Sequence, residues 1–138
     1  MIDTASLSAN ELVSKLMAIQ YKNVVKSVTT TGSDQTIYTC PTSTTLIQFT
    51  AIVKTFTIHN TTGGGGTVDV KVTDSSASAT QTINHFTSSD FATKKTVDAA
   101  GNGPIVLESA DILKIDTSVQ PANVLVSVME ISDSIKGA

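Results

Sequence analysis

The sequence predicts an all-β protein, an antiparallel β-sandwich or jelly roll of about eight strands with a short amphipathic helix at the N-terminus. Its 138 residues are 40% hydrophobic, which is enough for a single domain to bury a core. It holds 22 threonines and 16 serines but only 15% charged residues. Threonine suits pleated surfaces, and both residues suit turns. Period-two alternation returns roughly every 8 to 15 residues, as in sandwiches and barrels.

A helix is expected first, over residues 8–20. Ser8 and Glu11 form a capping box, which satisfies the free amides at a helix start. Apolar residues then recur at spacings of three and four, so one side of the helix is apolar. They are Leu12, Val13, Leu16, Met17 and Ile19. This side packs on the chain's own sheet or on a neighbouring subunit. Under the second alternative Leu12, Leu16 and Ile19 are interface residues.

Strands are expected from Lys22 onward. The first two, at 22–31 and 35–40, lie on either side of a turn at Gly32-Ser33-Asp34. Residues 43–60 are too many for one ordinary strand, so they form two strands or one strand bent by a bulge. Lys54 falls among the apolar positions of this stretch, which an edge position or a bulge explains.

The second half of the chain continues the strand pattern. The clearest strand is 67–74, with one valine face and one polar face. Weaker strands follow at 80–87 and 92–99. Two more are expected on either side of Ser109-Ala110, as a hairpin. We divide the chain into an arm and helix (1–21), a sandwich domain (22–132) and a C-terminal tail (133–138).

The last strand, residues 123–132, is apolar on both faces. Its even-numbered valines share one side, while Leu125, Met129 and Ile131 share the other. A strand of this kind lies in the middle of a sheet or against a subunit. Leu125 and Met129 are therefore candidate interface residues.

Four consecutive glycines, Gly63, Gly64, Gly65 and Gly66, invite comparison with a phosphate-binding loop. Such a loop requires a following Lys-Ser/Thr and a helix whose amides face the anion, and here a strand follows instead. We interpret residues 60–66 as a hairpin loop between two strands. Its tip is either free in solvent or pressed against another subunit, and in the second case the four glycines belong to an interface.

The residues for a catalytic or metal site are few. His59, His85 and Cys40 do not have ligand spacing, and no nucleophile elbow is present, so we expect no enzyme, no metal and no cofactor. The lone Cys40 is expected to be a small buried side chain. All nine basic residues are lysine and the net charge is −3, which argues against a nucleic-acid partner. No apolar run is long enough to span a membrane.

Three stretches resemble small structural proteins of tailed bacteriophage virions. They are TIYTCPTSTTLIQFTAIVKTFTIHNTT (36–62), TVDVKVTDSS (67–76) and IVLESADILKIDTSVQPANVLVSVMEIS (105–132). The shared features are an aromatic-Thr-x-Pro start, an Asn-Thr before a glycine loop, and a Leu-Glu-x-x-Asp turn before two closing strands. The N-terminal helix is not part of this pattern.

The resemblance implies a non-enzymatic β-sandwich of the virion, made in the host cytoplasm. The first expectation is a head decoration (cement) protein that binds the major capsid protein as a homo-oligomer, with a trimer as the guess. A tail, connector or fibre component that binds other virion proteins is the nearest alternative. A carbohydrate-binding or small-ligand-binding sandwich is the alternative from another class.

Overall fold

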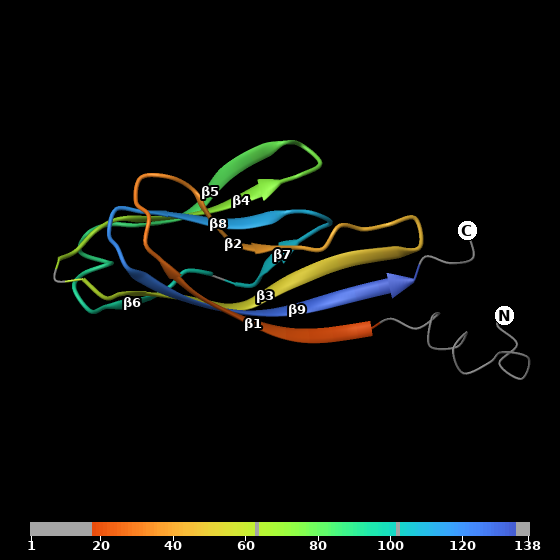
Figure 1. The fold of residues 1–138 in the computed structure, drawn as a ribbon, viewed down its shortest axis with the longest axis horizontal. Coiled ribbons are helices and arrows are strands. Elements are labelled where there is room, and N and C mark those ends of the chain that lie inside the picture. Colours follow the sequence, from red (N-terminus) through yellow and green to blue (C-terminus); the bar gives the residue numbers. More distant parts are fainter. Residues whose placement is uncertain (1–17, 63, 102, 135–138) are drawn as a thin grey trace, which may run out of the picture.

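The computed structural model describes residues 18–62, 64–101 and 103–134, and these form two antiparallel sheets around one hydrophobic core (Figure 1). Sheet A has the strand order β1-β9-β3-β6, and β7 also pairs with β3; sheet B has the order β2-β8-β4-β5. The all-β prediction is confirmed. The strands are β1 (Ala18–Val28), β2 (Gln35–Thr39), β3 (Ile47–Asn60), β4 (Val68–Asp74), β5 (Ala79–Phe86), β6 (Thr96–Asp98), β7 (Ile105–Leu107), β8 (Ile112–Thr117) and β9 (Ala122–Ser134).

The predicted helix lies mostly outside the described residues, because its positions 8–17 are among those not described. Its last residues, Ala18 to Gln20, are wrong as helix, since they begin β1. There they pair with Ser132 to Glu130 of β9. Pairing with a distant strand decides this segment, and local helical spacing does not contain that information.

Residues 43–60 contain one long strand with a bulge. β3 pairs with β9 from Ile47 to Asn60, and the register shifts between Val53 and Thr55. The extra residue is Lys54, which is exposed. The bulge interpretation is therefore confirmed, and it explains how a lysine occupies a position that strict alternation assigns to the apolar set.

The core lies between the inner faces of the two sheets. Sheet A contributes mainly the inward residues of its two central strands, and sheet B contributes those of β4 and β8. The largest fully buried side chains include Phe56, Ile58, Phe91, Leu107, Leu113 and Ile115. β9 lies between β1 and β3, which confirms the prediction that a strand apolar on both faces is central in its sheet.

Most neighbouring strands along the chain fall in opposite sheets. β3 belongs to sheet A and β4 to sheet B, so the prediction that the glycine loop is a hairpin is wrong. The hairpin predicted around Ser109-Ala110 is wrong for the same reason, since β7 is in sheet A and β8 in sheet B. There the Asp111 carboxylate accepts hydrogen bonds from the amides of Ser75 and Glu108 and holds the crossing turn. By contrast, β4 and β5 are a true antiparallel hairpin.

Candidate functional site

The outer face of sheet A carries a row of apolar side chains across four strands. Tyr21 of β1 is paired with Met129 of β9, Met129 with Ile52 of β3, and Ile52 with Val106 of β7. Tyr21 is 74% exposed and Val106 is 59% exposed. Because paired residues of adjacent strands point to the same side, these four side chains form one continuous stripe.

Further apolar residues extend this stripe along the strands. Ile19 is paired with Ile131, and Val25 with Leu125. Val25 is 79% exposed and Leu125 is 44% exposed. Exposed apolar residues scattered singly are ordinary, but a contiguous group marks a binding surface. We call this group the apolar face; it consists of Ile19, Tyr21, Val25, Ile52, Val106, Leu125, Met129 and Ile131.

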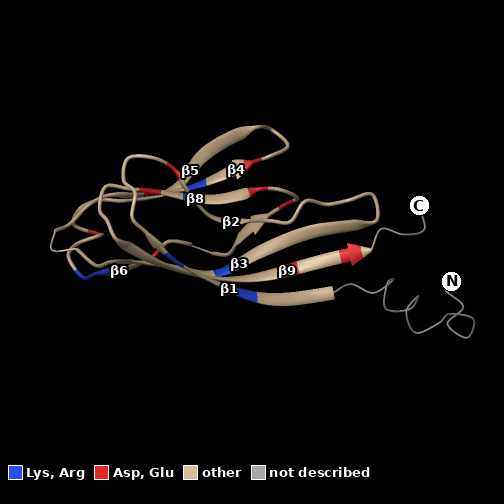
Figure 2. Cartoon of the chain, viewed as in Figure 1, with Lys and Arg blue, Asp and Glu red and all other residues tan. Residues whose placement is uncertain are grey.

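Small uncharged polar side chains fill the spaces between these residues. Asn23 is paired with Ser127, whose hydroxyl donates a hydrogen bond of 2.8 Å to the Asn23 side-chain oxygen. Ser127 is in turn paired with Thr55 of β3. Charged positions are few along the strands of sheet A (Figure 2). The described charged residues on this side include Lys54 at the bulge in the middle of β3, Asp98 of β6 and Asp133 near the end of β9.

The outer face of sheet B is charged. Lys71 of β4 lies 2.7 Å from Asp34 and 3.8 Å from Asp116, and the hydrogen bond to Asp34 raises the pKa of the Lys71 ammonium. Nearby, His85 Nδ1 hydrogen-bonds the Asp69 carboxylate. The two outer faces therefore differ: that of sheet A carries mainly apolar and small polar side chains, and that of sheet B carries ion pairs.

The predicted interface residues fall into three groups. Ile19, Leu125 and Met129 come together on the apolar face. Leu12, Leu16 and Gly63 lie outside the described residues, so their placement is not stated. The other members of this face, Tyr21, Val25, Ile52 and Val106, were not predicted. They are joined by cross-strand pairing over separations of up to about a hundred residues, which alternation along one strand does not reveal.

The remaining glycines of the loop pack within their own chain. A Cβ atom on Gly65 would lie 2.8 Å from the Ser88 carbonyl oxygen, and one on Gly66 would lie 2.2 Å from the Val119 side chain. The Gly66 amide also donates to the carbonyl of Phe91. A free tip is therefore wrong for Gly65 and Gly66, whereas Gly64 has open space around its Cα.

Asn60 anchors this loop from the end of β3. Its buried side-chain amide donates to the carbonyl oxygens of Gly64, Phe91 and Ala92, at 2.8 to 3.2 Å. Its side-chain oxygen accepts from the amide and the hydroxyl of Thr62. The asparagine therefore satisfies backbone groups of two crossing loops, which sequence patterns alone did not indicate.

A buried polar cluster lies between the sheets at the β1–β2 side. Glu130 of β9 accepts a hydrogen bond from the Tyr38 hydroxyl and pairs with Lys22 at 2.8 Å. Burial, followed by the bond to Glu130, raises the pKa of Tyr38 well above its usual value. Burial likewise raises the pKa of the Cys40 thiol to about 11, which keeps it protonated and unreactive at neutral pH.

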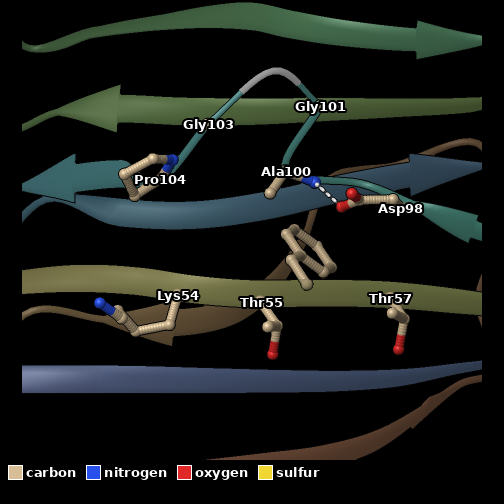
Figure 3. Close-up of a pocket in the computed structure, with 9 residues that line it drawn as sticks. Lys54, Thr55, Thr57, Asp98, Ala100, Gly101, Gly103 and Pro104 are labelled. Carbon is tan, nitrogen blue, oxygen red and sulfur yellow. Dashed lines mark hydrogen bonds between the residues drawn. The ribbon is translucent and has the colours of Figure 1, made fainter.

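Other candidate centres offer little convergent chemistry. A shallow hollow beside the bulge is lined by Lys54, Thr55 and Thr57 on one side and by the loop before Pro104 on the other (Figure 3). There the Asp98 carboxylate accepts from the amide of Ala100 at 3.1 Å. Within residues 18–62, 64–101 and 103–134, no group of three His, Cys, Asp or Glu side chains is arranged to hold a metal ion.

Comparisons with known proteins give a likeness in structure and none in sequence. No protein-family model matches the sequence, and no curated protein sequence matches it. The fold is similar to a solved structure described as "Bacillus endospore appendages form a novel family of disulfide-linked pili", with a TM-score of 0.43 and 14% sequence identity. The alignment covers 88% of this chain and 92% of that chain. Among the described residues there is no helix with the length and hydropathy of a membrane span.

Proposed function

We propose that the chain is a non-enzymatic structural protein that acts by packing its apolar face against a large protein assembly. Its most specific form is a decoration protein on the capsid of a tailed bacteriophage, a β-sandwich that binds the major capsid protein. The observation that carries the proposal is the uncharged stripe from Tyr21 to Val106 on the outer side of sheet A. The assignment to a virion rests on the sequence resemblance.

The chemistry of the apolar face favours a protein partner over a small ligand. The core of a protein–protein interface has few charged residues and many apolar and aromatic ones. Polar side chains in it form hydrogen bonds with the partner protein. Here Asn23, Ser127 and Thr55 supply such groups between the apolar residues. A sugar would require stacked aromatic rings, and Tyr21 is the one aromatic residue of this face.

The asymmetry of the two sheets supports one orientation on the assembly. The ion pairs of Lys71 with Asp34 and Asp116 suit a surface that remains in water. Moving the apolar face out of water lowers the free energy, so this face favours contact with a partner. We therefore place sheet A toward the capsid and sheet B toward the solvent.

Co-sedimentation with capsids that lack decoration protein tests the proposal. Leu125→Lys combined with Val106→Lys puts two charges on the apolar face without touching the β1 edge, and it should reduce capsid binding at least about tenfold. The control is Ala77→Lys in the exposed turn between β4 and β5, which should bind like the parent chain. Equal binding by both variants would overturn the use of this face. Binding to tails or to a glycan, with none to capsids, would overturn the capsid assignment.

A further inference from the structure

β1 is an open edge of sheet A. All eleven of its residues pair with β9 on one side, and no described strand pairs with it on the other. In an antiparallel strand, alternate residues direct their amide and carbonyl groups away from the existing partner. A long edge of this kind is a template for another strand.

The edge strand also carries much of the exposed apolar surface. Among the described residues, Tyr21 and Val25 are the two most exposed large hydrophobic residues, at 74% and 79%, and Ile19 is 48% exposed. All three lie on the outer side of β1. The open backbone and the apolar side chains are therefore parts of one surface.

Two lysines of β1, Lys22 and Lys26, lie on the inner side of the sheet, opposite the buried Val128 and Val124. Proteins often protect edge strands with lysines that project over the open backbone or point inward. Here Lys22 pairs with Glu130, and the Lys26 ammonium donates a 2.6 Å hydrogen bond to the Thr36 carbonyl of β2. Both ammonium groups are bound within the chain, Lys22 inside sheet A and Lys26 across to β2 of sheet B.

We propose that a second copy of this chain pairs with β1, antiparallel, about a two-fold axis through Asn23 and perpendicular to sheet A. Side chains alternate along a strand, so both apolar faces stay on one side only if the axis passes through a residue rather than between two. An axis through Asn23 pairs Ala18 with Val28 of the second copy, so the whole strand is used.

The positions of Lys22 and Lys26 favour the axis at Asn23 over an axis at the residue before or after it. With the axis at Asn23, Lys22 lies opposite Val24 of the second copy and Lys26 lies opposite its Gln20. An axis at Lys22 would place two copies of that lysine face to face, and an axis at Val24 would place Lys22 opposite Lys26. Like charges directly opposite are destabilising, and axes further from Asn23 shorten the paired stretch.

The resulting dimer continues sheet A from one copy into the next. Tyr21 of each copy lies opposite Val25 of the other, so the two apolar faces become one surface. The pairing is isologous and closed, as in most two-fold dimers. It goes beyond the proposed function and does not depend on a capsid.

Disulfide trapping of the full chain tests the axis. Facing residues of antiparallel strands have Cα atoms about 4.5 to 5.5 Å apart, which suits a disulfide. Asn23→Cys should therefore form a covalent dimer under mild oxidation. Ser27→Cys is the matched control, because residue 27 lies opposite Ile19 of the second copy. The native Cys40 is buried and should not link. No covalent dimer of Asn23→Cys, or equal trapping at position 27, would overturn the proposal.

Charge pairs test the same register without a covalent bond. Tyr21→Lys with Val25→Lys sets lysines opposite each other across the axis, whereas Tyr21→Glu with Val25→Lys sets opposite charges there. By sedimentation equilibrium, the first variant should raise the dimer dissociation constant about tenfold over the second. Thermal melts check that both variants fold. A parent chain that stays monomeric through the micromolar range, or equal dissociation constants, would overturn the pairing and leave the capsid proposal standing.

Discussion

The ammonium of Lys22 lies 2.8 Å from the Glu130 carboxylate, so β1 and β9 are joined by an ion pair on the inner side of sheet A. Tyr38, from β2 in sheet B, donates to the second carboxylate oxygen. The Glu130 side chain is 8% exposed and that of Lys22 is 43% exposed. One buried carboxylate therefore ties the two sheets together at the side where the core borders the β1 edge.

Glu130→Ala is expected to destabilise the fold by about 3 kcal/mol, because Tyr38 and Lys22 would both lose their partner at a buried position. Because the Lys22 side chain is partly exposed to solvent, loss of the ion pair should contribute little. Most of the destabilisation should come from the Tyr38 hydroxyl, which loses its hydrogen-bond acceptor at a buried position. Urea unfolding measures the change. Glu108→Ala, at an exposed position, is the matched control and should leave the midpoint nearly unchanged. Equal midpoints for the two variants would contradict a structural role for Glu130.

Stability is expected to fall as the pH rises above about 9. The folded chain holds the Cys40 proton up to a pKa of about 11 and the Tyr38 proton higher still, against ordinary values of 9.0 and 10.0. A raised folded-state pKa gives stability that is complete below the unfolded-state pKa and is lost above it. Each group should contribute a slope of at most about 1.4 kcal/mol per pH unit.

Urea midpoints at a series of alkaline pH values measure this loss. Tyr38→Phe should flatten the curve above pH 10. Tyr21→Phe is the control, because its hydroxyl is on an exposed residue. A Tyr38→Phe curve that follows the parent curve throughout would show that Tyr38 does not control the alkaline transition.

Gly65→Ala is expected to destabilise the chain by about 1 to 3 kcal/mol, since the new methyl group would meet the Ser88 carbonyl oxygen at 2.8 Å and backbone must move. Gly64→Ala is the matched control in the same loop, because nothing lies within 4 Å of its Cβ position. Thermal melts of both variants make the comparison. Similar melting temperatures would mean that the loop adjusts at no cost. Deleting two of the glycines should also lower the melting temperature.

Asn60→Ala is expected to cost about 2 to 4 kcal/mol, because three backbone carbonyl oxygens near the loop lose a donor in a buried place. His59→Ala is the neighbouring control; its ring bonds Thr96 at an exposed position. Chemical unfolding of both variants decides the matter, and a larger loss for His59→Ala would contradict the anchoring role of Asn60.

The alternation of apolar and polar residues along the sequence predicted several strands correctly. Alternation predicted the strand character of β3, β4 and β9. The misfit of Lys54 indicated an edge position or a bulge, and the structure has the bulge. The sequence around Leu125 and Met129, apolar on both faces, predicted a strand in the middle of a sheet or against a subunit, and β9 is central in sheet A. These features depend on side chains within one segment, which is the range over which a periodic pattern carries information.

Sequence patterns gave wrong predictions where the structure of a segment depends on strands that are distant in the sequence. The spacing of apolar residues favours a helix through Gln20, yet Ala18 to Gln20 join β9 as strand. The glycine loop was expected to be a hairpin, but its flanking strands enter opposite sheets. Turn residues show that the chain reverses and do not show which sheet receives the next strand.

The sequence by itself determined that this chain folds as β-strands, that its charges are few, and that its last strand is apolar on both faces. Only the tertiary structure decided that Tyr21, Met129, Ile52 and Val106 form one row. The physical reason is that strand pairing joins residues far apart in the sequence, from about fifty to about a hundred positions here. The backbone hydrogen bonds that pair two strands do not depend on the identity of the side chains, so the side chains do not reveal the partner strand.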